Sequence, residues 1–388
     1  MRHYSLRTSG SIKNAVVLFV FAIVCGNVMA QAPDTSYMFQ KIWGGTGQDY
    51  PYDAHIRSDG GYILGGVSTS FPGPYVSCWV MRTNYKGDTL WTTSYGGTGG
   101  TCDQQYINDI CENSDGGSIA VGGKTVCGNS NVGGDITRLD SNGNILWTKY
   151  CSASADPYPV IQTSDGNFIT GGYLTGLGAG GNEGFLMKLN STGDTIWSKT
   201  YGGTGDDWFY HILQTRDGGY LTCGKTTSFG QGMDDIYLVK TDANGNVMWS
   251  KAYGTSGEEV AFGHALQPTT DGGYILTGQG DAGSESAKGI FLLKIDSLGN
   301  MSWAKYYNGM WGHTVKQTPD GGYAIAGTGN YGSTSGDIVL IKTDASGNVQ
   351  WSKAYGGSGA EQGLVMELAN DGGYLVGGNR YIYGQVCR

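Results

Sequence analysis

Acidic and aromatic side chains recur in the glycine-rich segments between the apolar runs of this sequence. Carboxylates can bind hard cations or the hydroxyl groups of sugars, and aromatic faces can stack on sugar rings. We therefore predict a ligand-binding face, with calcium as its only candidate cofactor. Its leading candidates are Asp206, Asp207, Trp208, Asp234, Asp235, Glu258 and Glu259. The competing interpretation is that these acids cap turns and keep a glycine-rich surface soluble.

Histidines offer a second kind of chemistry, because neutral imidazole is a common metal ligand. Four of them, His55, His211, His264 and His313, stand in four different parts of the chain. No two have the i, i+2 or i, i+4 spacing of a metal-binding pair. The sequence therefore predicts scattered polar strand residues and no metal site, and the alternative is a metal site that lines a central channel.

Motifs of known catalytic mechanism are missing from the chain. It contains no Gly-x-Ser-x-Gly elbow, no His-Glu-x-x-His pair and no P-loop. The segment 242–246, Asp-Ala-Asn-Gly-Asn, is too short for a calcium loop with a distal glutamate, so we interpret it as a turn. We predict a protein without catalytic residues. The alternative is an extracellular polysaccharide hydrolase or lyase that uses the loop carboxylates.

A repeat of about 50 residues determines where these side chains stand. Asp-Gly-Gly, or once Asp-Gly-Asn, recurs seven times at intervals of 49 to 56 residues, and a second pattern, [Asp/Asn]-x-x-Gly-[Asp/Asn]-x-x-Trp, recurs six times in step with it. In one repeat the apolar runs 208–215, 220–226, 236–241 and 247–253 are separated by turn residues. Four short strands per repeat, 69 glycines and no helical periodicity predict an all-β propeller.

Seven four-stranded blades are expected, with strand one of each blade innermost and both longer connections on one face of the ring. The four histidines then fall on innermost strands. An N-terminal strand within residues 36–45 would close the last blade as its fourth strand. The last blade has two predicted strands around Asp371 at the C-terminus, so we predict that its third strand is missing. We interpret the last blade as truncated, and the alternative is a three-stranded closing blade.

The N-terminus has the order of a secretory signal peptide. Basic residues precede the short apolar run 15–24, and a small-residue cleavage site ends at Ala30. We expect residues 1–30 to be the signal peptide, residues 31–388 to form one propeller domain, and no transmembrane segment. The formal net charge of −9 argues against nucleic acid as a partner. The expected location is extracellular or on the outer cell surface.

The repeats resemble the glycine-rich propeller proteins exported as type IX secretion cargo. The resemblance rests on segments such as 197–207 (WSKTYGGTGDD), 214–220 (QTRDGGY) and 238–246 (LVKTDANGN), and it covers residues 36–384. It implies a propeller fold and export, and it supplies no catalytic residues. Members usually end in a small sorting domain, which this chain lacks.

From these observations we predict a non-enzymatic binding or scaffold module whose long-loop face takes an extracellular glycan or a surface protein. A third alternative is a structural spacer within a longer adhesin.

Overall fold

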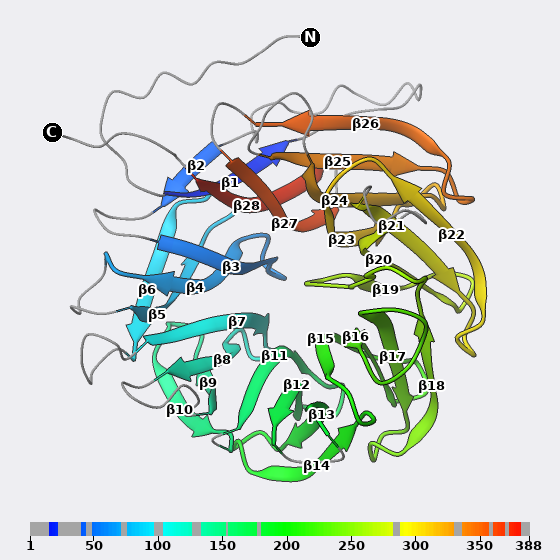
Figure 1. Ribbon diagram of the computed structural model, residues 1–388. Coiled ribbons are helices and arrows are strands. Elements are labelled where there is room, and N and C mark those ends of the chain that lie inside the picture. Colours follow the sequence, from blue (N-terminus) through cyan, green and yellow to red (C-terminus); the bar gives the residue numbers. More distant parts are fainter. Residues whose placement is uncertain are drawn as a thin grey trace, which may run out of the picture.

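The computed structural model describes the backbone of residues 15–21, 40–43, 49–70, 76–96, 104–125, 133–152, 154–176, 180–281, 288–329, 336–356, 360–368 and 372–381. Every strand in these ranges pairs in an antiparallel sheet of four strands. Figure 1 shows the sheets arranged around a common centre. This arrangement confirms the prediction of a propeller with four-stranded blades.

Six blades consist of four strands that follow one another in the chain. The first strand of each repeat lies nearest the centre of the ring, as expected (Figure 1). These inner strands are β3 (Asp49–Ile56), β7 (Gln104–Glu112), β11 (Ala155–Gln162), β15 (Asp207–Gln214), β19 (Leu266–Pro268) and β23 (Trp311–Gln317).

The second and third strands form the middle of each blade and are mostly buried. The second strands are β4 (Tyr62–Ser68), β8 (Ser118–Thr125), β12 (Phe168–Thr175), β16 (Tyr220–Thr226), β20 (Tyr274–Asp281) and β24 (Tyr323–Gly329). The third strands are β5 (Ser77–Thr83), β9 (Gly134–Leu139), β13 (Asn182–Leu189), β17 (Asp235–Thr241), β21 (Lys288–Ile295) and β25 (Asp337–Thr343).

The fourth strands form the periphery and expose one face. They are β6 (Thr89–Tyr95), β10 (Ile145–Tyr150), β14 (Thr195–Tyr201), β18 (Val247–Tyr253), β22 (Met301–Tyr307) and β26 (Val349–Tyr355). In the repeat read from the sequence, the bounds of β16 and β18 match the prediction, and β15 and β17 each begin one residue earlier.

The remaining sheet is not a unit of the repeat, because it joins the two ends of the chain. Its order is β2-β1-β28-β27, with β27 (Ala360–Leu368) and β28 (Tyr374–Tyr381) from the C-terminal part. As predicted, the N-terminal strand β2 (Gln40–Trp43) is its fourth strand. The prediction of a missing third strand is wrong, because β1 (Ala15–Phe21) fills that place and pairs with all of 374–380. The three-stranded alternative is wrong for the same reason.

Strand β1 is also the apolar part of the expected signal peptide. Its sequence, AVVLFVF, combines β-branched and aromatic residues that suit a buried strand as well as a signal sequence. The structure thus gives these residues a place in the ring, whereas cleavage after Ala30 remains a prediction.

Packing between neighbouring blades forms the hydrophobic core. In several blades, the tryptophan of the fourth strand contacts the tyrosine or phenylalanine that follows the Asp-Gly-Gly-type turn of the next blade. These ring pairs, with centroids 5.9 to 6.2 Å apart, are Trp147–Phe168, Trp197–Tyr220, Trp303–Tyr323 and Trp351–Tyr374. These tryptophans therefore hold neighbouring blades together.

Both longer connections meet on one side of the ring, as predicted. The backbone N–H of Gly205, in a connection between blades, donates a hydrogen bond to Ser228 Oγ in the β16–β17 loop at 2.9 Å. The opposite side carries the tight turns. In the 242–246 turn Asp242 Oδ1 accepts the backbone N–H groups of Asn244 and Asn246, which confirms its interpretation as a turn.

No helix among the described residues is both long and apolar enough to cross a membrane. Four cysteines in the described ranges, Cys78, Cys111, Cys151 and Cys223, are free thiols.

Candidate functional site

Three of the predicted site residues are buried acids that cap the loops between blades. Asp207 Oδ2 accepts hydrogen bonds from Gly203 N and Ser228 Oγ, at 2.8 and 2.7 Å. Asp235 Oδ2 accepts Gln231 N at 2.9 Å, and Glu259 accepts both the N–H and the hydroxyl of Thr255. These contacts agree with the interpretation that the loop acids cap turns, while their role in binding stays a prediction.

The other predicted residues occupy the same side of the ring but do not converge on one point. Asp206 Oδ1 accepts the backbone N–H of Asn182 at 2.7 Å, which ties its loop to the preceding blade. Glu258 N donates to Asp281 Oδ2 at 3.3 Å. Asp234 pairs with Lys225 at 3.0 Å, and the Lys225 ammonium lies 5.0 Å from the centre of the Trp208 ring.

Trp208 belongs to a continuous set of half-buried rings, here called the aromatic row. Its members are Tyr158, Tyr173, Trp208, Tyr210 and Phe262. Tyr173 stacks on Trp208 with centroids 4.1 Å apart, Tyr158 meets Tyr210 at 5.2 Å, and Tyr210 meets Phe262 at 4.9 Å. The row runs across three neighbouring blades near the starts of their inner strands, which is the long-loop end.

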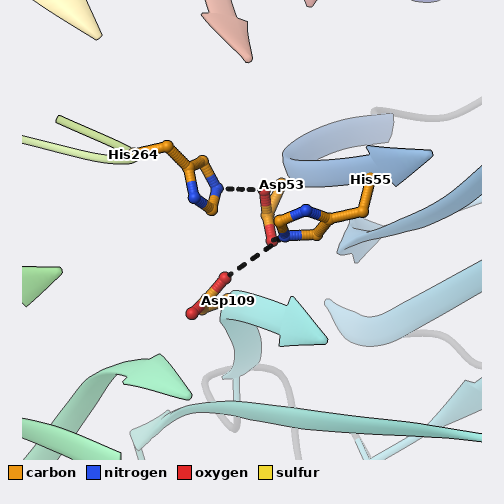
Figure 2. A group of neighbouring side chains, drawn as sticks. All are labelled: Asp53, His55, Asp109 and His264. Atoms are coloured by element: carbon orange, nitrogen blue, oxygen red, sulfur yellow. Dashed lines mark hydrogen bonds and ion pairs between the residues drawn. The ribbon is translucent and has the colours of Figure 1, made fainter. Parts of the chain in front are cut away.

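At the centre of the ring, side chains meet from two inner strands and from the segment just before β19, so the prediction that His264 falls on an innermost strand is wrong. Figure 2 shows them as the central cluster, which consists of Asp53, His55, Asp109 and His264. Asp53 Oδ1 lies 2.7 Å from His264 Nε2, and Asp53 Oδ2 lies 3.0 Å from His55 Nε2. Asp109 Oδ1 lies 4.0 Å from His55 Nε2. The prediction of scattered, unrelated histidines is therefore wrong for His55 and His264.

Backbone amides fix both carboxylates of the central cluster. Asp53 accepts hydrogen bonds from the N–H groups of Ala54 and Ile110, at 2.7 and 3.0 Å. Asp109 accepts those of Ile110 and Val160, at 3.0 and 2.7 Å. Since Ile110 and Val160 each belong to the next blade, these aspartates also connect neighbouring inner strands.

Burial and close charges shift the titration of the central cluster. For Asp53, burial would raise the pKa, but His55 and His264 together hold it well below its usual range. For His55, burial would lower the pKa, and the attraction of Asp53 and Asp109 holds it well above its usual range. Burial and the Asp53 charge raise the pKa of Asp109 to about 6. These shifts favour a negatively charged Asp53 beside a positively charged His55.

A pattern in the repeats points to the cluster, although spacing along the chain does not. When the repeats are aligned on their Asp-Gly-Gly turns, Asp53, Asp109 and His211 fall at the same position, six residues before the turn aspartate. Equivalent positions of different blades line the same ring around the axis. His264, one position earlier, then reaches Asp53 from a blade that is not its neighbour.

The opposite, short-turn side carries a hollow of about 540 Å³. Turn residues line it, among them Arg216, Asp217, Thr270 and Gln317. It lies on the side where the sequence predicted no ligand.

The fold defines the class to which the chain is similar: all-β propellers with four-stranded blades. No protein-family model matches the chain, and no curated protein matches it in sequence.

Solved structures that share the fold include two WD40 domains. The domain of Neurospora crassa Pan2 has a TM-score of 0.53 at 11% identity and covers 85% of this chain and 89% of its own. The propeller domain of Doa1 has a TM-score of 0.51 at 12% identity, and the match covers 86% of this chain and 92% of the Doa1 chain. A protein of unknown function from Bacteroides caccae has a TM-score of 0.43 at 12% identity, and the match covers 71% of this chain and 89% of the other. At 11% and 12% identity, the likeness to the two WD40 domains establishes the fold alone.

Proposed function

We propose that this protein is a non-enzymatic binding module of the cell exterior and that the aromatic row is its contact surface for an extracellular glycan. The single observation that carries the proposal is the row itself, in which five rings in mutual contact remain half-buried beside long loops. Ring faces offer a flat apolar surface to a sugar. The predicted signal peptide and the resemblance to type IX cargo support an extracellular location.

Charged groups beside the row would supply the polar half of such a site. The Asp234–Lys225 pair lies against Trp208, and Asp156 accepts the hydroxyl groups of Tyr106 and Tyr173, both at 3.2 Å. Sugar hydroxyls both donate and accept, so a mixture of carboxylate and ammonium groups suits them better than either alone.

Calcium belongs to the proposal as a structural ion of the loops. Asp207 and Glu183 both approach the point where a Cβ on Gly202 would lie, at 2.3 and 2.8 Å, and Asp235 and Glu259 approach the equivalent point at Gly254. Asp207 Oδ1 and Asp235 Oδ1 are buried without a hydrogen-bond partner among the described residues. Two buried carboxylates beside each other, one of them an aspartate with an unpartnered oxygen among the described residues, suit a hard cation.

The test is a glycan array on the full chain, followed by calorimetry with the best-binding oligosaccharide, with and without calcium. Trp208→Ala and Tyr210→Ala should each weaken binding about tenfold or more, because both remove stacking surface. Tyr150→Ala is the control, since Tyr150 is 67% exposed on β10, away from the row.

Each alternative predicts a different result. A hydrolase or lyase would shorten the captured oligosaccharide, and its products would appear by mass spectrometry. A structural spacer would bind no glycan while remaining folded. Equal loss in Tyr150→Ala and Trp208→Ala would remove the aromatic row from consideration.

A further inference from the structure

The central cluster has the donor set of a transition-metal site. Two imidazole nitrogens and two carboxylate oxygens, one from each of its four residues, all lie within 4.8 Å of one another. Imidazole and carboxylate together are ligands of Zn²⁺, whereas Ca²⁺ and Mg²⁺ prefer oxygen alone. In a tetrahedral zinc site with bonds of about 2.0–2.2 Å, ligand atoms are roughly 3.3–3.6 Å apart. The widest separations in the cluster would have to close by about 1 Å, and the two contacts of Asp53 with the imidazoles would have to open by about 0.5 Å.

Backbone hydrogen bonds hold the two carboxylates of the cluster in place. Each carboxylate is held on both sides by backbone N–H groups, from Ala54 and Ile110 for Asp53 and from Ile110 and Val160 for Asp109. Such hydrogen bonds orient ligands before a metal arrives. The carboxylates therefore need no rearrangement of the backbone to bind an ion.

A third histidine adds an independent observation. His211 is only 9% exposed, its ring lies 5.5 Å from that of His264, and its Nδ1 is buried with no partner among the residues that the structure describes. A buried polar atom without a partner is costly, and a bound ion with its water would satisfy it. His211 thus stands beside the cluster as a group that the protein alone leaves unsatisfied.

Charge favours a dication at the same place. The two carboxylates lie close together in a largely buried place, with the imidazoles of His55 and His264 beside them (Figure 2). A dication would neutralise both acids and would release the imidazoles from their role as hydrogen-bond donors to Asp53.

We propose that Asp53, His55, Asp109 and His264 form a zinc site that ties three blades together across the centre of the ring. His264 belongs to the fifth blade, Asp53 and His55 to the first, and Asp109 to the second. The metal would join non-neighbouring blades, which ordinary packing between adjacent blades does not do. The site is separate from the aromatic row, so this proposal and the proposed glycan binding can fail independently.

The experiment measures Zn²⁺ and Co²⁺ binding to the full chain after removal of metal. The expected result is one equivalent of Zn²⁺ by calorimetry, a rise in melting temperature, and visible Co²⁺ absorption bands of four-coordinate intensity. His264→Gln and His55→Gln should each weaken Zn²⁺ binding by more than about 100-fold, as for loss of a ligand. His313→Gln is the matched control, because His313 also lies on an inner strand but outside the cluster.

Two results would overturn the proposal. One is wild-type protein that binds no Zn²⁺ at micromolar concentration. The four side chains would then connect the blades through hydrogen bonds and would hold no metal. The other is binding that His313→Gln weakens as much as His264→Gln does. The absorption bands of Co²⁺ guard against binding by the free thiols, because thiolate ligation adds an intense near-ultraviolet band that imidazole and carboxylate ligands do not give.

Discussion

Asp217 shows what the aspartate of an Asp-Gly-Gly turn does for a blade. Its Oδ1 accepts the backbone N–H of Gly219 at 3.1 Å, and its Oδ2 lies 2.9 Å from the ammonium of Lys240 on β17. Lys240 is buried, whereas the Asp217 side chain is half-exposed. Burial would raise the pKa of Asp217, but Lys240 and the turn hydrogen bonds lower it to about 2. One carboxylate thus both shapes the turn and neutralises a buried lysine.

Asp217→Asn should lower stability above about pH 4 and have little effect near pH 2. Because the folded-state pKa of Asp217 lies below the unfolded value, its contribution is present above the unfolded pKa and is lost as the pH falls toward 2. Exposure limits the effect to roughly 1 kcal/mol or less. Urea unfolding of both proteins from pH 2 to 7 measures it. A difference that stays constant over this range would contradict the ion pair as its cause.

For single residues, the sequence predicted the role of the turn aspartates, but it did not predict which side chains meet at the centre of the ring. The turn aspartates follow from local patterns, since Asp-Gly-Gly between apolar runs is a turn wherever it stands. The contact between His264 and Asp53 joins residues 211 positions apart. No local pattern encodes that contact, because it exists only once the ring has closed.

At the scale of the element, the glycines of the two kinds of blade turn differ in what surrounds them. Gly218 and Gly245 have similar positive φ angles of 80° and 75°. A Cβ on Gly218 would meet nothing within 4 Å, whereas a Cβ on Gly245 would lie 2.9 Å from the Trp197 ring of the preceding blade. The two positions share the backbone strain and differ only in the contact between blades.

Gly245→Ala should therefore destabilise the protein more than Gly218→Ala does. The left-handed conformation costs an L-residue about 1–2 kcal/mol in both variants. Crowding of Trp197 should add roughly 1–3 kcal/mol in Gly245→Ala alone. Equilibrium unfolding in urea compares the two variants with the wild type. Equal losses would mean that Trp197 moves aside freely and that its packing contributes little to the contact between blades.

The strands of a blade could be predicted from sequence because every one of their signals is local. Alternating apolar residues, Asp-Gly-Gly turns and the Asp-x-x-Gly-x-x-x-Trp pattern place β15 to β18 within one residue. Strand β1 was not predicted, because its apolar residues are typical both of a β-strand and of the apolar part of a signal peptide. Their strand partners, β28 from the other end of the chain and β2, come together only when the ring closes.

At the scale of the whole molecule, closure depends on how the two ends of the chain meet. Strand β1 pairs on one side with residues 374–380 of β28 and on the other with β2, so it connects β2 to the rest of the sheet. An unpaired strand edge exposes backbone N–H and C=O groups that other chains can bind. The expected cleavage after Ala30 would create such an edge on β28.

Residues 31–388 should therefore fold with six blades intact but with a weakened closing sheet. Without β1, the chain should melt several degrees below the full chain and self-associate through the edge of β28. Hydrogen exchange should be faster in 374–381 and unchanged in a central strand such as β16. Light scattering and exchange on both chains measure these effects. If 31–388 stays monomeric and fully protected in 374–381, then β2 must pair with β28 directly, and β1 is a strand only while the N-terminus is still attached.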